Sequence, residues 1–207
     1  MNRRRHSHSH RRTAAAAVTV LAAVALSGCA AGAAHPGAAA VVGDQRIAVA
    51  TLQSEVTAYR TALATGGSGA AEPASVPAQT LQWLVLAQVV QQTVAEHGLT
   101  VTEGEVQQAE ASDAAQAGGV QALQSAFVSQ LALAPSSMEM FYRMRAGEME
   151  LLTQAGVAPT SNQAGAELQQ ILTASADRLG VQVNPRYGVW NAGKLALGAP
   201  SEPWLKA

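Results

Sequence analysis

AVVGDQRIAV, residues 40–49, places a Gly-Asp pair between two short apolar runs. A Gly-Asp pair in this setting is typical of a tight turn, so the stretch predicts a two-stranded β-hairpin. An isolated hairpin is marginally stable in water and needs a third strand or a helix to pack on. The other strand candidate lies near the far end of the chain, so the hairpin predicts where the two ends of the domain meet.

That second stretch is VQVNPRYGVW, residues 181–190, in which apolar positions alternate with polar or small ones. Such alternation is typical of a strand with one buried face. We expect residues 181–189 to form one strand that pairs with the hairpin. The pairing would produce a small antiparallel sheet that joins the N- and C-terminal ends of the domain.

About six helices are expected between these two regions, which makes the fold mainly α. The second is apolar on nearly every side, which predicts the most buried element, and Gly98 followed by Leu99 indicates a Schellman ending for it. Thr102 and Glu105 form the pattern of a capping box, and Ser136 to Glu139 also has a capping pattern. The expected helices cover residues 51–64, 79–97, 102–116, 120–133, 136–154 and 161–179, with Gly- or Pro-containing connections between them.

The first 28 residues have the composition of an export signal. Residues 1–12 contain five Arg, three His and no acidic residue, and residues 13–26 are apolar or small throughout. That apolar segment has the length of a signal-peptide core and is short for a bilayer span. It ends in Leu26-Ser27-Gly28-Cys29, which resembles the lipobox of bacterial lipoproteins, in which cleavage before the cysteine is coupled to its lipidation. The alternative is an ordinary secretory signal with a chance cysteine.

Lipidation at Cys29 would change the chemistry of the mature chain. Cys29 is the only cysteine, so no thiol would remain for redox chemistry or nucleophilic catalysis. Two or more acyl chains such as palmitate anchor a protein stably, and residues 29–39 would form a flexible tether to the extracytoplasmic face of the cell membrane. Removal of the leader leaves eight Lys or Arg against fourteen Asp or Glu, a net charge of −6.

Charge and motifs exclude several functional classes. A chain without a basic surplus has no obvious electrostatic attraction for nucleic acid. No HExxH, GxSxG, P-loop or GxGxxG motif occurs. The acid pairs Glu103/Glu105 and Glu148/Glu150 have a spacing of two, which places their members on different faces of a helix, and we interpret them as solvated surface. His97 follows a helix C-terminus, where a structural role is expected. We therefore expect no catalytic residue, no metal, no cofactor and no enzymatic activity.

Four of the five methionines occur between residues 138 and 149. Flexible thioethers suit surfaces that accept varied apolar partners. We expect one face of this helix to carry the candidate client-binding residues Met138, Phe141, Tyr142 and Met149, with Met140 and Met144 on an adjoining face. The alternative is that these side chains fill the core.

Three motifs resemble those of SurA-like N-terminal domains, which occur in periplasmic and surface foldases. The sequence AVVGDQRI at residues 40–47 resembles the family's V-x-G-x-x-I hairpin, and LTVTEGEV at 99–106 resembles its turn into the third helix. VQVNPRYGVW at 181–190 is similar to the closing strand of lipoproteins of this type. Together the motifs span residues 40–190 in the expected order.

The resemblance implies a helical chaperone domain over residues 40–190, followed by an irregular tail at 191–207. Many such foldases also carry a parvulin prolyl isomerase domain, and the short connection at residues 156–160 leaves no room for one. The expected function is a lipid-anchored, extracytoplasmic, chaperone-like protein that binds unfolded or nascent exported polypeptides without ATP. The alternative is a structural adaptor for one specific cell-envelope partner.

Overall fold

The computed structural model describes residues 37–66, 72–73 and 75–200. The predicted leader and the predicted cleavage and lipidation site at Gly28 and Cys29 lie outside the described residues, as do residues 201–207. No helix in the described part of the chain is long and apolar enough to span a membrane.

The predicted hairpin and its closure by a distant strand are confirmed. Strands β1, Ala38–Val42, and β2, Gln45–Ala48, pair antiparallel around Gly43, whose φ of +56° suits glycine. Strand β3, Gln182–Val183, pairs antiparallel with β1, which places β1 in the centre of a three-stranded sheet. Because Ala38 and Ala39 are buried in β1, the prediction of a tether through residue 39 is wrong for these two positions.

The prediction of one strand over residues 181–189 is wrong, because the chain turns after Val183. The Asn184 Oδ1 accepts a hydrogen bond from the backbone N–H of Arg186, and the Tyr187 N–H donates to the Asn184 carbonyl. An Asn side chain that bonds to its own backbone two residues on favours a turn over a strand. Pro185 cannot donate to a strand ladder, which also ends the pairing.

The prediction of an irregular tail is wrong for residues 191–198. Strands β4, Val189–Asn191, and β5, Ala196–Gly198, form a second antiparallel hairpin around a 3₁₀ turn at Ala192–Lys194. The Asn191 Oδ1 accepts a hydrogen bond from the Lys194 N–H and so caps this turn. A bulky residue at Gly188 would clash with the Gly198 carbonyl, so glycine permits the close approach of the two strands.

Six α-helices follow the expected order in the described residues, with shifted ends. The second, α2, begins three residues earlier than expected, with Pro77 in its first turn. A π-helical turn at Phe127–Leu131 replaces the second half of the fourth helix. The helices are α1 (Val49–Thr65), α2 (Val76–Glu96), α3 (Glu103–Ala117), α4 (Val120–Ala126), α5 (Met138–Gln154) and α6 (Ala164–Leu179).

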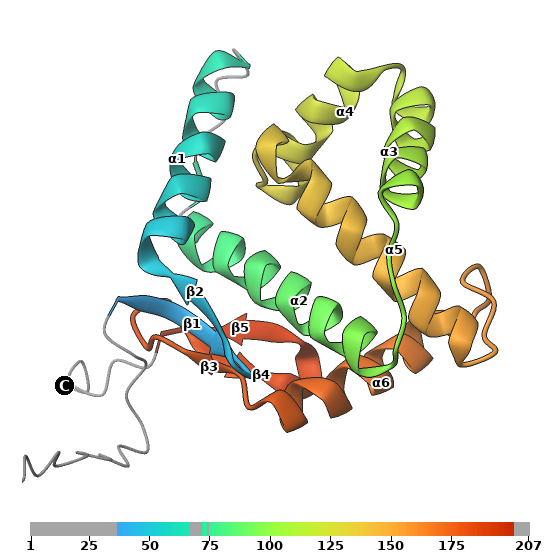
Figure 1. Ribbon diagram of the computed structural model, residues 1–207. Coiled ribbons are helices and arrows are strands. Elements are labelled where there is room, and N and C mark those ends of the chain that lie inside the picture. Colours follow the sequence, from blue (N-terminus) through green and yellow to red (C-terminus); the bar gives the residue numbers. More distant parts are fainter. Residues whose placement is uncertain (1–36, 67–71, 74, 201–207) are drawn as a thin grey trace, which may run out of the picture. The chain divides into compact units, whose positions relative to one another are not determined.

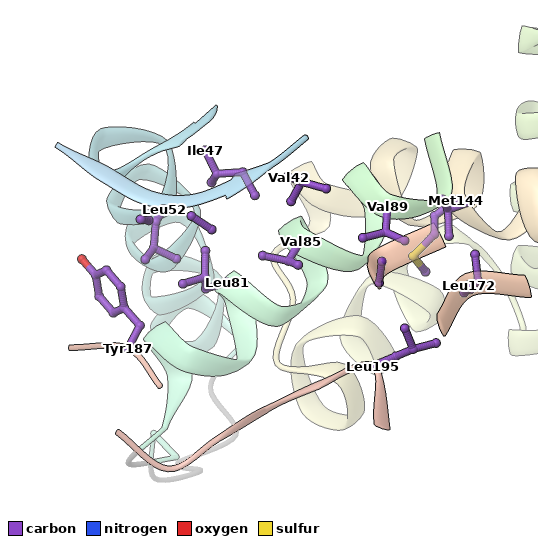
Figure 2. Close-up of a cluster of buried hydrophobic side chains, with 14 of the residues drawn as sticks. Val42, Ile47, Leu52, Leu81, Val85, Val89, Met144, Leu172, Tyr187 and Leu195 are labelled. Carbon is purple, nitrogen blue, oxygen red and sulfur yellow. The ribbon is translucent and has the colours of Figure 1, made fainter. Parts of the chain in front are cut away.

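Helix α2 occupies the centre of the domain, as expected from its apolar character. It runs across the sheet, while α3, α4 and α5 gather on the side away from the strands (Figure 1). Its side chains Leu81, Val85 and Val89 are fully buried. They form the middle of a hydrophobic cluster that extends from Val42, Ile47 and Leu52 to Met144 and Leu172 (Figure 2). The sheet that joins the chain ends therefore packs on the same core as the helices.

Of the two predicted helix caps, one is present and one is not. The Thr102 capping box is present in full, since the Glu105 N–H donates to Thr102 Oγ1 and the Thr102 N–H donates to Glu105. At the start of α5, however, Ser137 makes no side-chain cap. Its hydroxyl instead donates to Glu55 Oε2 at 2.7 Å, which connects α5 to α1.

Candidate functional site

A groove of about 520 Å³ lies between α2 and α5 in the described residues, and we name it the α2–α5 groove. Ligand pockets in proteins typically measure about 300–1,000 Å³. Apolar side chains provide most of the lining, and polar ones stand at its rim. The lining residues are Ala87, Val90, Gln91, Val94, Ala95, Leu99, Thr100, Val101, Ser136, Glu139, Met140, Arg143, Met144 and Gly147.

One wall of the groove is a stripe along α2. Ala87, Val90, Gln91, Val94 and Ala95 have spacings of three and four, so they lie on one helix face. Val90 and Val94 are almost completely buried at the bottom, and Gln91 and Ala95 are exposed at the edge. This wall therefore passes from apolar floor to solvent without any charged side chain.

The opposite wall is a matching stripe along α5. Glu139, Met140, Arg143, Met144 and Gly147 also recur every three or four residues. Met144 is buried in the core, and Met140 is partly exposed. The two methionines thus give this wall flexible, polarisable surface at two depths.

The end of α2 brings a third group of side chains into the groove. The Leu99 N–H donates to the Val94 carbonyl and the Gly98 N–H to the Ala95 carbonyl, which is the predicted Schellman ending with Gly98 at φ +68°. This turn sends the chain back along α5. Leu99, Thr100 and Val101 consequently line the groove.

Gly147 sets how closely the two walls approach. A Cβ at this position would lie 3.0 Å from a γ-methyl of Val90 and 3.0 Å from a γ-methyl of Val94. Glycine therefore lets α5 contact α2 directly at the bottom. The groove opens beside this contact.

Charge at the groove is confined to the α5 side. The Arg143 guanidinium donates to Glu139 at 2.9 Å and to Glu103, at the start of α3, at 2.7 Å. These hydrogen bonds to Glu139 and Glu103 raise the pKa of Arg143. One cation is thus shared by two carboxylates, which leaves a net charge of −1 in the group.

The predicted client-binding face is wrong for two of its four residues. Met138 and Tyr142 are buried, at 4% and 2% exposure, in a cluster with Phe127 and Leu123. Phe141 is partly buried, and Met149 is exposed beside a different, smaller depression between α3 and α5. The four side chains do not form one accessible surface, so the alternative of core packing holds for Met138 and Tyr142.

Aromatic packing explains why this face turns inward. Phe141 makes edge-on contacts with Trp83, Phe127 and Tyr142, with ring centroids 5.0–5.7 Å apart. The Tyr142 hydroxyl donates to Asp113 at 3.0 Å. Burial has the larger effect and this hydrogen bond adds to it, and together they raise the pKa of Tyr142 well above its ordinary value. The cluster joins α2, α3, α5 and the π-helical turn.

The groove residues Met140 and Met144 belong to the adjoining face that the sequence also identified. For the α2 side of the groove, the sequence predicts only a buried helix and a Schellman ending at Gly98 and Leu99. The groove itself depends on how α2 and α5 diverge, which no local pattern reports. The spacing of three and four on both helices was the one signal available.

Two other sequence interpretations have clear outcomes. The His97 Nδ1 donates to Gln154 Oε1 at 2.6 Å, and the Gln154 side-chain amide donates to the His97 carbonyl. These two hydrogen bonds connect the C-terminal ends of α2 and α5, which gives His97 a structural role. The interpretation of Glu148 as solvated surface is wrong, since its side chain is only 16% exposed. Burial raises the pKa of Glu148, and Arg145 at 4.0 Å offsets this only in part.

Other hollows in the described residues are built differently. A larger and more open depression of about 770 Å³ lies along α1 and is lined only by small, hydroxyl or amide side chains, such as Ala50, Ser54 and Thr57. Another, of about 310 Å³, lies between Tyr59, Trp83 and the π-helical turn. In the described part of the chain, no three His, Cys, Asp or Glu side chains group together as a metal site would require.

Comparison with known proteins places the chain in a family. A search of curated proteins gives no match, and a search of solved structures gives none either. The family model of the SurA-like N-terminal domain matches residues 2–154, which end at the last residue of α5 and include both walls of the groove. Because this match covers most of the chain, and the helical fold with a small antiparallel sheet agrees with it, the protein belongs to the SurA-like N-terminal domain family.

Proposed function

We propose that this protein is a lipid-anchored, extracytoplasmic, chaperone-like protein that holds apolar segments of exported polypeptides without ATP. The observation that supports it best is the α2–α5 groove, which presents Val90, Val94 and Met144 at the base of an open channel. Membership of a chaperone-related family agrees with a role in binding client polypeptides. Binding occurs without chemical change to the client, so no enzymatic activity is part of the proposal.

The groove suits transient capture of varied segments. A flexible methionine adapts to side chains of different shape, so Met140 and Met144 tolerate many apolar partners. The rim of Gln91, Thr100 and Ser136 can hydrogen-bond to the backbone of a bound segment. An apolar centre with a polar rim is the usual anatomy of a protein–protein interface.

Aggregation of a denatured client tests this function. The mature lipidated chain from Cys29, reconstituted in lipid nanodiscs, is expected to suppress light scattering at several-fold molar excess. The Ala95→Trp variant fills the groove from an exposed position and is expected to lose most of the suppression. Ala174→Trp, at an exposed position of α6, is the matched control. Equal suppression by both variants, or none by the wild type, would contradict the proposal.

The membrane anchor needs a separate test. Cells that express the chain with radiolabelled palmitate are expected to label the wild type and not the Cys29→Ala variant. Labelling of both, or of neither, contradicts lipidation at Cys29. Crosslinking in membranes then distinguishes many weak clients, which the chaperone-like role requires, from one stoichiometric partner, which would indicate an adaptor.

A further inference from the structure

We propose that the α2–α5 groove selects segments in which a short aliphatic run is flanked by Lys or Arg. The inference rests on the proposed function, because it specifies which part of an exported polypeptide the groove takes. Three features carry it: the length of the walls, the apolar floor and the one-sided charge.

The walls limit the bound segment to a few residues. Ala87 to Ala95 on α2 and Glu139 to Gly147 on α5 each advance about 12 Å along their helix axes. An extended chain rises about 3.3 Å per residue, so about four residues fit between the ends. A segment with two or three aliphatic side chains matches this length and a volume of about 520 Å³.

The floor accepts aliphatic side chains and has no partner for a buried charge. Val90, Val94 and Met144 present methyl groups and a thioether at the base. A charged side chain placed there would lose its hydration without compensation. Any charge of the ligand must therefore lie at the rim.

The rim favours a positive charge. The carboxylates of Glu139 and Glu103 are 68% and 56% exposed, whereas the Arg143 side chain between them is only 38% exposed. The two carboxylates are therefore more exposed to solvent than the Arg143 side chain. A Lys or Arg next to the aliphatic run can therefore approach Glu139 or Glu103 from outside, and the uncharged α2 wall does not oppose it.

The charge of the domain as a whole points the same way. The described residues contain seven Lys or Arg and thirteen Asp or Glu, a net charge of −6. Such a surface repels acidic segments during approach and attracts basic ones. A second copy of this chain would bring the same acidic surface, which makes a polypeptide with basic flanks the better occupant.

Two fluorescent peptides with the same aliphatic core, one flanked by lysines and one by glutamates, test the inference. The protein is the mature lipidated chain from Cys29, without the five arginines of residues 1–12, in nanodiscs of zwitterionic phosphatidylcholine, so that the basic peptide gains nothing from the lipid. Exposed ion pairs contribute about 0.2–1 kcal/mol each, so two pairs predict binding of the lysine peptide that is tighter by about twofold to thirtyfold. The preference should shrink as salt is raised from about 0.02 M to 0.5 M.

Charge reversal identifies the residue responsible. Glu139→Lys is expected to remove or invert the preference, and Glu139→Gln to reduce it. Asp177→Lys makes the same change in net charge at an exposed position of α6 and is expected to keep it. Ala95→Trp is expected to weaken binding of both peptides.

The outcomes separate this inference from the proposed function. Equal affinities of the wild type for both peptides, with binding still lost in Ala95→Trp, would overturn the charge selection and leave capture by the groove intact. The charge selection is also overturned if Glu139→Lys has the same effect on the preference as Asp177→Lys. If neither peptide binds and the wild type does not suppress aggregation, the proposed function is overturned as well.

Discussion

Gly147 is the residue on which the contact between the groove walls depends most directly. Alanine is favoured over glycine inside a helix by about 1 kcal/mol. At Gly147, however, the added methyl group would meet Val90 and Val94 at 3.0 Å, and overpacking costs about 1–3 kcal/mol. We predict that Gly147→Ala lowers the free energy of unfolding by about 1 kcal/mol, as measured by urea denaturation.

Gly165 provides the control for this substitution. It lies in the first turn of α6, where a new Cβ meets nothing within 4 Å. Gly165→Ala should therefore raise stability by about 0.5 kcal/mol. If Gly147→Ala also stabilises the protein, the close contact between α2 and α5 does not limit the packing.

Glu148 predicts a pH-dependent effect at the residue scale. Burial raises its pKa in the folded state, so folding favours the protonated form. Below about pH 4.3, the ordinary pKa of Glu, the side chain is protonated in both states and carries no penalty. As the pH rises through the folded-state pKa, the buried carboxylate loses a proton and stability is lost.

Glu148→Gln is therefore expected to be more stable than the wild type at pH 7 and to lose that advantage towards pH 4. Urea denaturation at several pH values measures the difference. Glu150→Gln controls for the removal of a carboxylate from the same helix. An advantage that is independent of pH would show that ionisation of Glu148 is not its cause.

Helix ends give the prediction at the scale of elements. Thr102 caps α3 with two backbone hydrogen bonds in the capping box, and replacing a Thr cap by Ala typically costs about 1 kcal/mol. Thr102→Ala should thus lower stability by about this amount and increase hydrogen exchange in the first turn of α3. The Ser137 side chain, by contrast, makes no cap. Ser137→Ala should therefore leave hydrogen exchange at the start of α5 unchanged and weaken only the contact with Glu55. Faster hydrogen exchange at the start of α5 in Ser137→Ala would show that Ser137 does cap this helix.

Elements were predictable from the sequence where a few neighbouring residues determine them. The capping box at Thr102 and the Schellman turn at Gly98 involve partners within five residues, so the local pattern was sufficient. At Ser137 a distant carboxylate, Glu55, competes for the hydroxyl, and a local pattern contains no trace of it. Alternation over residues 181–189 likewise does not reveal that the Asn184 side chain accepts a hydrogen bond from the Arg186 N–H and so forms a turn.

At the scale of the whole molecule, the closing of the chain ends was predictable and the groove was not. A hairpin that needs a third strand, with one further strand candidate in the chain, leaves little choice of partner. The groove, by contrast, depends on which face of α5 turns towards α2. Both faces of α5 carry methionines, and the aromatic contacts of Phe141 and Tyr142 turn their side inward. Hydrophobicity alone does not distinguish these faces.

The three-stranded sheet β2–β1–β3 is expected to contribute to the stability of the entire domain. β1 is paired on both edges and packs on α2, so its loss would expose the central core. Asn184 fastens this sheet, since its N–H donates to the Ala39 carbonyl and its side-chain amide to the Ala38 carbonyl. Asn184→Ala removes the side-chain bonds and is expected to lower the global free energy of unfolding by about 1–2 kcal/mol.

Native-state hydrogen exchange checks whether that loss is global. In Asn184→Ala, the slowest amides of β1 and of α2 should accelerate by the same factor, because both exchange only when the domain unfolds. Asn191→Ala removes the side-chain hydrogen bond that caps the turn between β4 and β5, and it should accelerate hydrogen exchange only near residues 191–194. If Asn184→Ala accelerates exchange in β3 alone while α2 keeps its protection, the strand would be an attached segment rather than part of the cooperative core. Equal acceleration would instead show that two stretches separated by more than a hundred residues stabilise α2 together, and with it one wall of the groove.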